Sequence, residues 1–171
     1  MIERTWNEVR NRHGPREDAN ARRILEKFAA SDLEADPVAA VKAGKARCTT
    51  YHFGFLDNAA ERVGTHACDV RMVLIGGELT SLTIEKSTGD GFHASLKRYR
   101  VNAMACLGRT SLKGHSVTRY NLAVPRNKEN ANYGNKVGML VSIGGRPALV
   151  SLNQNGFTEP DPTFFEVMVL E

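Results

Sequence analysis

The chain has 171 residues, of which 42% are hydrophobic and 25% charged, and its formal net charge is +4 at pH 7. This composition is typical of a soluble globular protein and excludes the disordered and fibrous classes. A chain of this length can bury a core large enough to fold without metal or disulfide staples. We therefore expect an N-terminal arm over residues 1–14 and a single domain over residues 15–171.

The sequence shows no membrane or export signal. Its first residues mix both charges and lack the apolar segment of a signal peptide, and no apolar run approaches eighteen residues. We expect a cytoplasmic protein with no membrane partner. The spacing of Cys48, Cys68 and Cys106 matches no zinc site, so we interpret all three as buried thiols. The alternative is that Cys106, in a basic neighbourhood, is a nucleophile.

Two helix-start signals occur near the N-terminus. Pro15, followed by acids and by apolar residues at helical spacing, predicts a helix over residues 15–30. Asp36-Pro37 predicts a second, short helix that ends before Gly44.

After Gly44 the sequence changes to short alternating runs that predict strands. Gly76-Gly77 and Gly144-Gly145 predict two tight hairpin turns, because paired glycines tolerate positive φ. Pro147 lacks a backbone donor and predicts that its strand starts at a sheet edge. The predicted strands cover residues 47–55, 66–75, 78–86, 115–124, 147–153 and 163–170.

Between the hairpins, apolar residues at helical spacing predict a helix over residues 93–107, although Arg100 falls within its apolar stripe. A long polar loop over residues 125–135 follows. The predicted fold class is α+β, with N-terminal helices, six to seven mostly antiparallel strands and one inserted helix.

Charge is strongly polarised along the chain. Residues 91–128 contain no Asp or Glu, and residues 91–158 contain ten Lys or Arg against one acid. Clustered cations neutralise phosphates, and tyrosines can stack on unpaired bases. The block therefore predicts a non-enzymatic module that binds nucleic acid or another polyanion, unless it is only a solvated basic face. The candidate binding residues are Lys97, Arg98, Tyr99, Arg109, Lys113, Arg119, Tyr120, Arg126 and Lys128.

Two alternatives stay open. The fragment around His93 superficially resembles the H-x-S/T unit of two-histidine phosphoesterases, so a small phosphoester hydrolase would use His93 with His52, His66 or His115. Alternatively, sheet edges and an acidic C-terminal segment favour self-assembly into a homo-oligomer, as in a coat, packaging or inhibitor protein. No motif indicates a cofactor, a metal or a catalytic residue.

Overall fold

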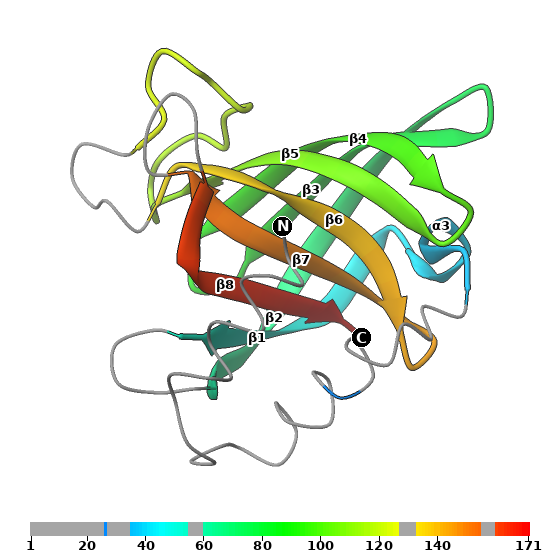
Figure 1. The fold of residues 1–171 in the computed structure, drawn as a ribbon, viewed down its shortest axis with the longest axis horizontal. Coiled ribbons are helices and arrows are strands. Elements are labelled where there is room, and N and C mark those ends of the chain that lie inside the picture. The colour runs from blue at the N-terminus through cyan, green and yellow to red at the C-terminus, as the bar shows by residue number, and fades with distance from the viewer. Residues whose placement is uncertain (1–25, 27–34, 55–59, 127–132, 155–159) are drawn as a thin grey trace.

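The computed structural model describes residues 26, 35–54, 60–126, 133–154 and 160–171. Within these ranges the chain forms a closed antiparallel barrel of eight strands (Figure 1). Each strand pairs with the next along the chain, and β8 pairs with β1 to close the barrel. The strands are β1 (Gly44–Phe53), β2 (Ala60–Ile75), β3 (Glu78–Lys86), β4 (Gly91–Arg100), β5 (Ala103–Ser111), β6 (Asn135–Ile143), β7 (Arg146–Gln154) and β8 (Pro160–Leu170).

The predicted α+β class is therefore wrong. The segment expected to be a helix over residues 93–107 is instead the β4–β5 hairpin. Phe92, Ala94 and Leu96 alternate with polar residues and are buried, as the two-residue period of a strand requires. The apolar residues of β4 and β5, counted as one segment across the turn, happen to fall at helical spacing. Arg100, which did not fit the apolar stripe of the predicted helix, lies at that turn.

Other elements predicted from the sequence also differ in the structure. Residues 115–124 form no strand and belong to the connection between β5 and β6. Asp36-Pro37 opens only a four-residue helix, α3 (Pro37–Ala40), in which the Asp36 carboxylate accepts a hydrogen bond from the Val38 amide. The predicted helix over residues 15–30 lies outside the described residues, apart from Glu26.

Both predicted hairpin turns are confirmed. Gly76 and Gly77 have φ of 59° and 82°, and Gly144 and Gly145 have φ of 59° and 74°. These positive angles suit the primed turns that match strand twist. The predicted sheet edge at Pro147 is wrong, because β7 pairs with β6 on one side and β8 on the other.

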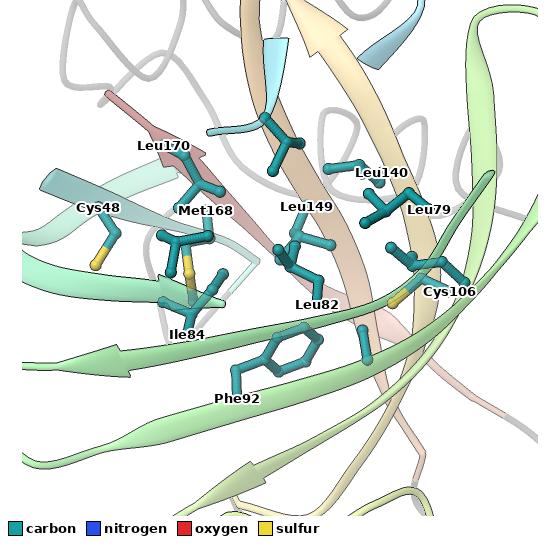
Figure 2. Close-up of a cluster of buried hydrophobic side chains, with 14 of the residues drawn as sticks. Cys48, Leu79, Leu82, Ile84, Phe92, Cys106, Leu140, Leu149, Met168 and Leu170 are labelled. Atoms are coloured by element: carbon teal, nitrogen blue, oxygen red, sulfur yellow. The ribbon is translucent and has the colours of Figure 1, made fainter. Parts of the chain in front are cut away.

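The barrel interior is apolar over much of its length. One cluster draws buried side chains from all eight strands, which only inward-facing residues can do (Figure 2). Its largest fully buried members include Leu79, Leu82, Ile84 and Leu140. Val38 and Val41, in and just after α3, pack against this cluster and close one end of the barrel.

A second apolar cluster lies on the outward face of β1 and of β5 to β8. Phe53 and Phe165, opposite each other on β1 and β8, stack with ring centroids 4.6 Å apart. Both faces of β7 are consequently buried. No helix among the described residues is long and apolar enough to cross a membrane.

The two ends of the barrel differ. We call the end with α3 and the β2–β3, β4–β5 and β6–β7 turns the helix end, and the end with the β3–β4 turn and the long β5–β6 connection the loop end (Figure 1). The apolar interior lies toward the helix end, and polar side chains face inward toward the loop end.

Candidate functional site

Several polar side chains face the barrel interior toward the loop end, and we call five of them the interior polar cluster. Cross-strand pairing sets their direction. His52 of β1 lies opposite Glu166 of β8, and Thr50 lies opposite the inward-facing Met168. Lys86 of β3 lies opposite the inward-facing Cys68. The cluster comprises Thr50, His52, Lys86, Lys136 and Glu166.

Glu166 lies at the centre of this cluster. Its Oε1 atom is 2.9 Å from Nζ of Lys136, and its Oε2 atom is 3.2 Å from Nε2 of His52. Burial opposes ionisation of this carboxyl group, but the charge of Lys136, the hydrogen bond with His52 and the charge of Lys86 hold its pKa well below its ordinary value. Glu166 is therefore a carboxylate, and it neutralises Lys136.

Lys86, unlike Lys136, has no counter-ion among the residues that the structure describes. Its ammonium lies 3.3 Å from the hydroxyl oxygen of Thr50. No carboxylate among the residues that the structure describes lies within ion-pair distance of it. One carboxylate thus faces two lysine ammonium groups inside the barrel. An interior cation of this kind is costly unless something neutralises it.

Solvent reaches the cluster to different extents. The Lys136 side chain is 4% exposed, whereas those of Glu166 and His52 are 11% and 20% exposed. Lys86 is partly exposed. An eight-stranded barrel is just wide enough either to be filled by side chains or to hold one small ligand. The cluster is therefore a set of charged groups that a small molecule at the loop end could contact.

The interior polar cluster was not predicted from the sequence. Its members come from four strands and are far apart in sequence, so no motif spacing connects them. One local signal was present: Glu166 interrupts the apolar run from Phe165 to Leu170. A charged residue in a buried strand needs a partner, and only the closed barrel shows that Lys136 supplies it.

The structure gives two of the predicted polyanion-binding residues structural roles. Nη1 and Nη2 of Arg98 lie 2.8 Å and 3.2 Å from the Asp36 carboxylate, and Nε lies 3.4 Å from Glu78. Arg109 donates to the Val124 carbonyl and, at 2.8 Å, to the Asn135 side chain. Both guanidinium groups thus stabilise connections of the barrel.

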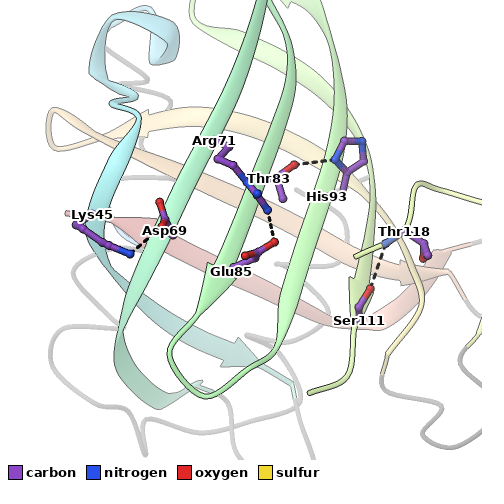
Figure 3. Close-up of polar contacts among 8 residues, drawn as sticks. All are labelled: Lys45, Asp69, Arg71, Thr83, Glu85, His93, Ser111 and Thr118. Atoms are coloured by element: carbon purple, nitrogen blue, oxygen red, sulfur yellow. Dashed lines mark hydrogen bonds and ion pairs between the residues drawn. The ribbon is translucent and has the colours of Figure 1, made fainter. Parts of the chain in front are cut away.

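Asn135 extends the second of these networks. Its side chain donates to the Asn121 carbonyl at 2.7 Å and accepts from the Asn121 amide at 3.0 Å. The Thr118 amide also donates to the Ser111 hydroxyl (Figure 3). These bonds hold the irregular connection against β5.

The remaining predicted residues do not form one surface. Lys97 and Tyr99 are exposed near the helix end of β4, whereas Lys113, Arg119 and Arg126 are exposed in the connection that follows β5. Tyr120, in the same connection, is partly buried. Lys128 lies outside the described residues. The acid-free block of the sequence is therefore divided between the two ends of the barrel.

The histidines of the predicted phosphoesterase site are also separated. His93 faces outward on β4, and its Nδ1 atom lies 2.9 Å from the Thr83 hydroxyl (Figure 3). Burial and the charge of Arg119 lower its pKa. His52 and His66 face inward, so the sheet lies between them and His93. Within the described ranges, no group of three or more His, Cys, Asp or Glu is placed to hold a metal ion.

The cysteines are buried thiols, as predicted. All three belong to the interior apolar cluster, and Figure 2 labels Cys48 and Cys106 there. Burial raises the pKa of Cys106 to about 12, and burial together with a hydrogen bond to Cys48 raises that of Cys68 to about 12. The thiolate is the nucleophilic form. These values argue against the nucleophile alternative for Cys106.

The chain was compared with protein-family models, curated proteins and solved structures. No family model, curated protein or solved structure matches the chain.

Proposed function

We propose that the protein binds a small anionic molecule at the loop end of the barrel interior. The observation that carries this proposal is the interior ammonium of Lys86, which contacts the Thr50 hydroxyl but no carboxylate of the described chain. Lys136 already has Glu166 as its counter-ion. A carboxylate or phosphate group would supply the missing negative charge and would accept hydrogen bonds from Lys86.

The same geometry limits the kind of ligand. The interior toward the helix end is filled by fully buried side chains such as Leu82 and Leu140, so the ligand would contact the polar half of the barrel. Glu166 would repel an anion that approached it directly. The anionic group would therefore lie on the Lys86 and Thr50 side of the cluster.

Titration with benzoate tests this proposal, with benzyl alcohol as the uncharged analogue of similar shape. We expect the wild-type protein to bind benzoate and to prefer it over benzyl alcohol. Lys86→Met should weaken benzoate binding about tenfold or more, which corresponds to the loss of about 1.4 kcal/mol. Lys97→Met, which removes an exposed cation on the outward face of β4, is the matched control.

Acetate and inorganic phosphate complete the series of probes, and amide chemical shifts report where each one binds. The proposal is wrong if none of these anions shifts the amides of Thr50 and Lys86 at millimolar concentration. Equal losses of benzoate affinity in Lys86→Met and Lys97→Met would also overturn it, because general surface charge would then explain binding.

Nucleic-acid binding is a second candidate function, and one observation favours it. Lys113 and Arg119 are exposed in the β5–β6 connection and make no ion pair with a residue that the structure describes. Residues 112–126 contain no acid. This connection could contact a phosphate backbone without competition from nearby carboxylates.

Fluorescence anisotropy with labelled RNA and DNA at several salt concentrations tests this second function. Lys113→Glu combined with Arg119→Glu should weaken binding and reduce the salt slope by about two, since each lost phosphate contact removes about 0.9. Lys42→Glu, at the exposed helix end, is the control. Unchanged affinity in the double variant would exclude the connection as the binding surface.

A further inference from the structure

Five large apolar side chains are exposed near the helix end of the barrel. Val73, Leu74 and Ile75 end strand β2, and their exposed fractions are 51%, 50% and 67%. Tyr99 and Val101, at and just after the end of β4, are 60% and 84% exposed. Single exposed apolar residues are common, but a contiguous group marks an interaction site.

Arg98 joins the two turns that carry these residues. Its Nε atom lies 3.4 Å from the Glu78 carboxylate, directly after the β2–β3 turn. Its Nη1 atom donates to the Val101 carbonyl at 3.0 Å. The β2–β3 hairpin and the β4–β5 turn therefore project from the same end of the barrel (Figure 1). We call the surface formed by Val73, Leu74, Ile75, Tyr99 and Val101 the helix-end tip.

Acids near the helix-end tip that the structure describes have partners. Asp36 and Glu78 pair with Arg98. Glu171 pairs with Arg47 and Arg146. Farther along the outward face, Asp69 pairs with Lys45 and Glu85 with Arg71 (Figure 3).

Three cations at this end have no described counter-ion. Lys42, Lys97 and Arg100 are exposed and make no ion pair with any residue that the structure describes. The Arg100 guanidinium lies 5.2 Å from the centre of the Tyr99 ring. The helix-end tip thus combines aliphatic side chains, an aromatic ring and uncompensated positive charge.

We propose that the helix-end tip docks on an anionic lipid surface. Anionic headgroups would neutralise Lys97 and Arg100, and the acyl region would receive Ile75 and Val101. Tyrosine is enriched where one end of a side chain is in apolar surroundings and the other in water. A nucleic acid would engage the cations but would leave the aliphatic side chains in water. Docking of this kind needs no spanning segment, and it is independent of the interior polar cluster.

Co-sedimentation of the full chain with vesicles tests the proposal. The vesicles contain phosphatidylcholine either alone or with phosphatidylserine. We expect sedimentation with the anionic vesicles, weakened at least about tenfold by Ile75→Asp combined with Val101→Asp. Lys97→Gln combined with Arg100→Gln should weaken it about thirtyfold and remove most of its salt dependence.

The matched control is Val63→Asp combined with Leu122→Asp. These residues are 49% and 54% exposed and lie toward the loop end, so the variant adds the same charges away from the helix-end tip. We expect it to sediment like the wild type, and circular dichroism is the check that each variant is folded. The proposal fails if the wild type does not sediment with anionic vesicles, or if both Asp variants lose binding equally. RNA binding that depends on Lys97 and Arg100, without vesicle binding, would also overturn it.

Discussion

The Lys136 ammonium and the Glu166 carboxylate lie 2.9 Å apart inside the barrel, with side chains that are only 4% and 11% exposed. They belong to strands β6 and β8, which β7 separates. Ser151 of β7 lies opposite both Gly138 of β6 and Glu166, so the ion pair spans the inner face of the middle strand. A pair this deeply buried is sensitive to the loss of one partner.

Removing Glu166 alone should be strongly destabilising. Glu166→Leu leaves the Lys136 ammonium buried without a counter-ion, and we expect a loss of about 3–5 kcal/mol in the free energy of unfolding. Lys136→Met combined with Glu166→Leu should cost much less than the sum of the single changes. Urea unfolding of the four proteins measures this coupling. Additive effects would show that the two groups do not stabilise each other.

Acid should destabilise the fold partly through Glu166. The carboxyl group has a folded pKa below its ordinary value of 4.5, so its contribution to stability is complete above that pH. As the pH falls below 4.5, the unfolded chain takes up the proton first and the contribution declines by up to about 1.4 kcal/mol per pH unit. Unfolding free energies between pH 3 and 6 should show a shallower slope for Lys136→Met combined with Glu166→Leu. Identical slopes would contradict the assignment.

The three cysteines should be protected from thiol reagents. Because the pKa values of Cys68 and Cys106 are raised to about 12, both are thiols at pH 8, and their burial also blocks access. We expect all three cysteines to react with dithionitrobenzoate only when urea unfolds the protein. Rapid reaction of one thiol in the folded protein would show that the barrel interior opens, and mass spectrometry would identify the residue.

Gly108 should be intolerant of a side chain. It faces the barrel interior opposite Ala94, and a methyl group there would overlap the ring of Phe92. We expect Gly108→Ala to lower the free energy of unfolding by about 1–3 kcal/mol. Gly108→Ala should cost less unfolding free energy in Phe92→Leu than in the wild type, because the smaller leucine side chain makes room for the added methyl group. Thermal unfolding measures this cost in each background, and an equal cost in both would assign it to the backbone.

Local chemistry predicted the turns, and alternation predicted most strands. Gly76-Gly77 and Gly144-Gly145 adopt positive φ angles that few other residues tolerate. The glycine dipeptide alone was therefore sufficient to predict each turn. The strand predicted over residues 163–170 lies within β8, which pairs with β1. These features depend on neighbours in sequence.

Barrel closure and the interior polar cluster could not be predicted in the same way. The helix expected over residues 93–107 failed because the period of apolar residues was counted across the β4–β5 turn. The residues of the basic block point in different directions, because charge in sequence does not show direction: Lys136 faces inward, Arg98 pairs with Asp36, and Lys97 faces outward. Only the pairing of distant strands determines these directions.

The pairing of β8 with β1 also shapes how the chain must fold. Seven ladders join strands that follow each other along the chain, whereas the eighth joins segments more than 100 residues apart, such as Cys48 and Leu170. Closing so long a loop carries the largest entropic cost, and β8 leaves the ribosome after every other strand. Until it arrives, β1 and β7 present unpaired backbone that can recruit a neighbouring chain. A chain in which β8 has not yet docked therefore exposes two strand edges to its neighbours.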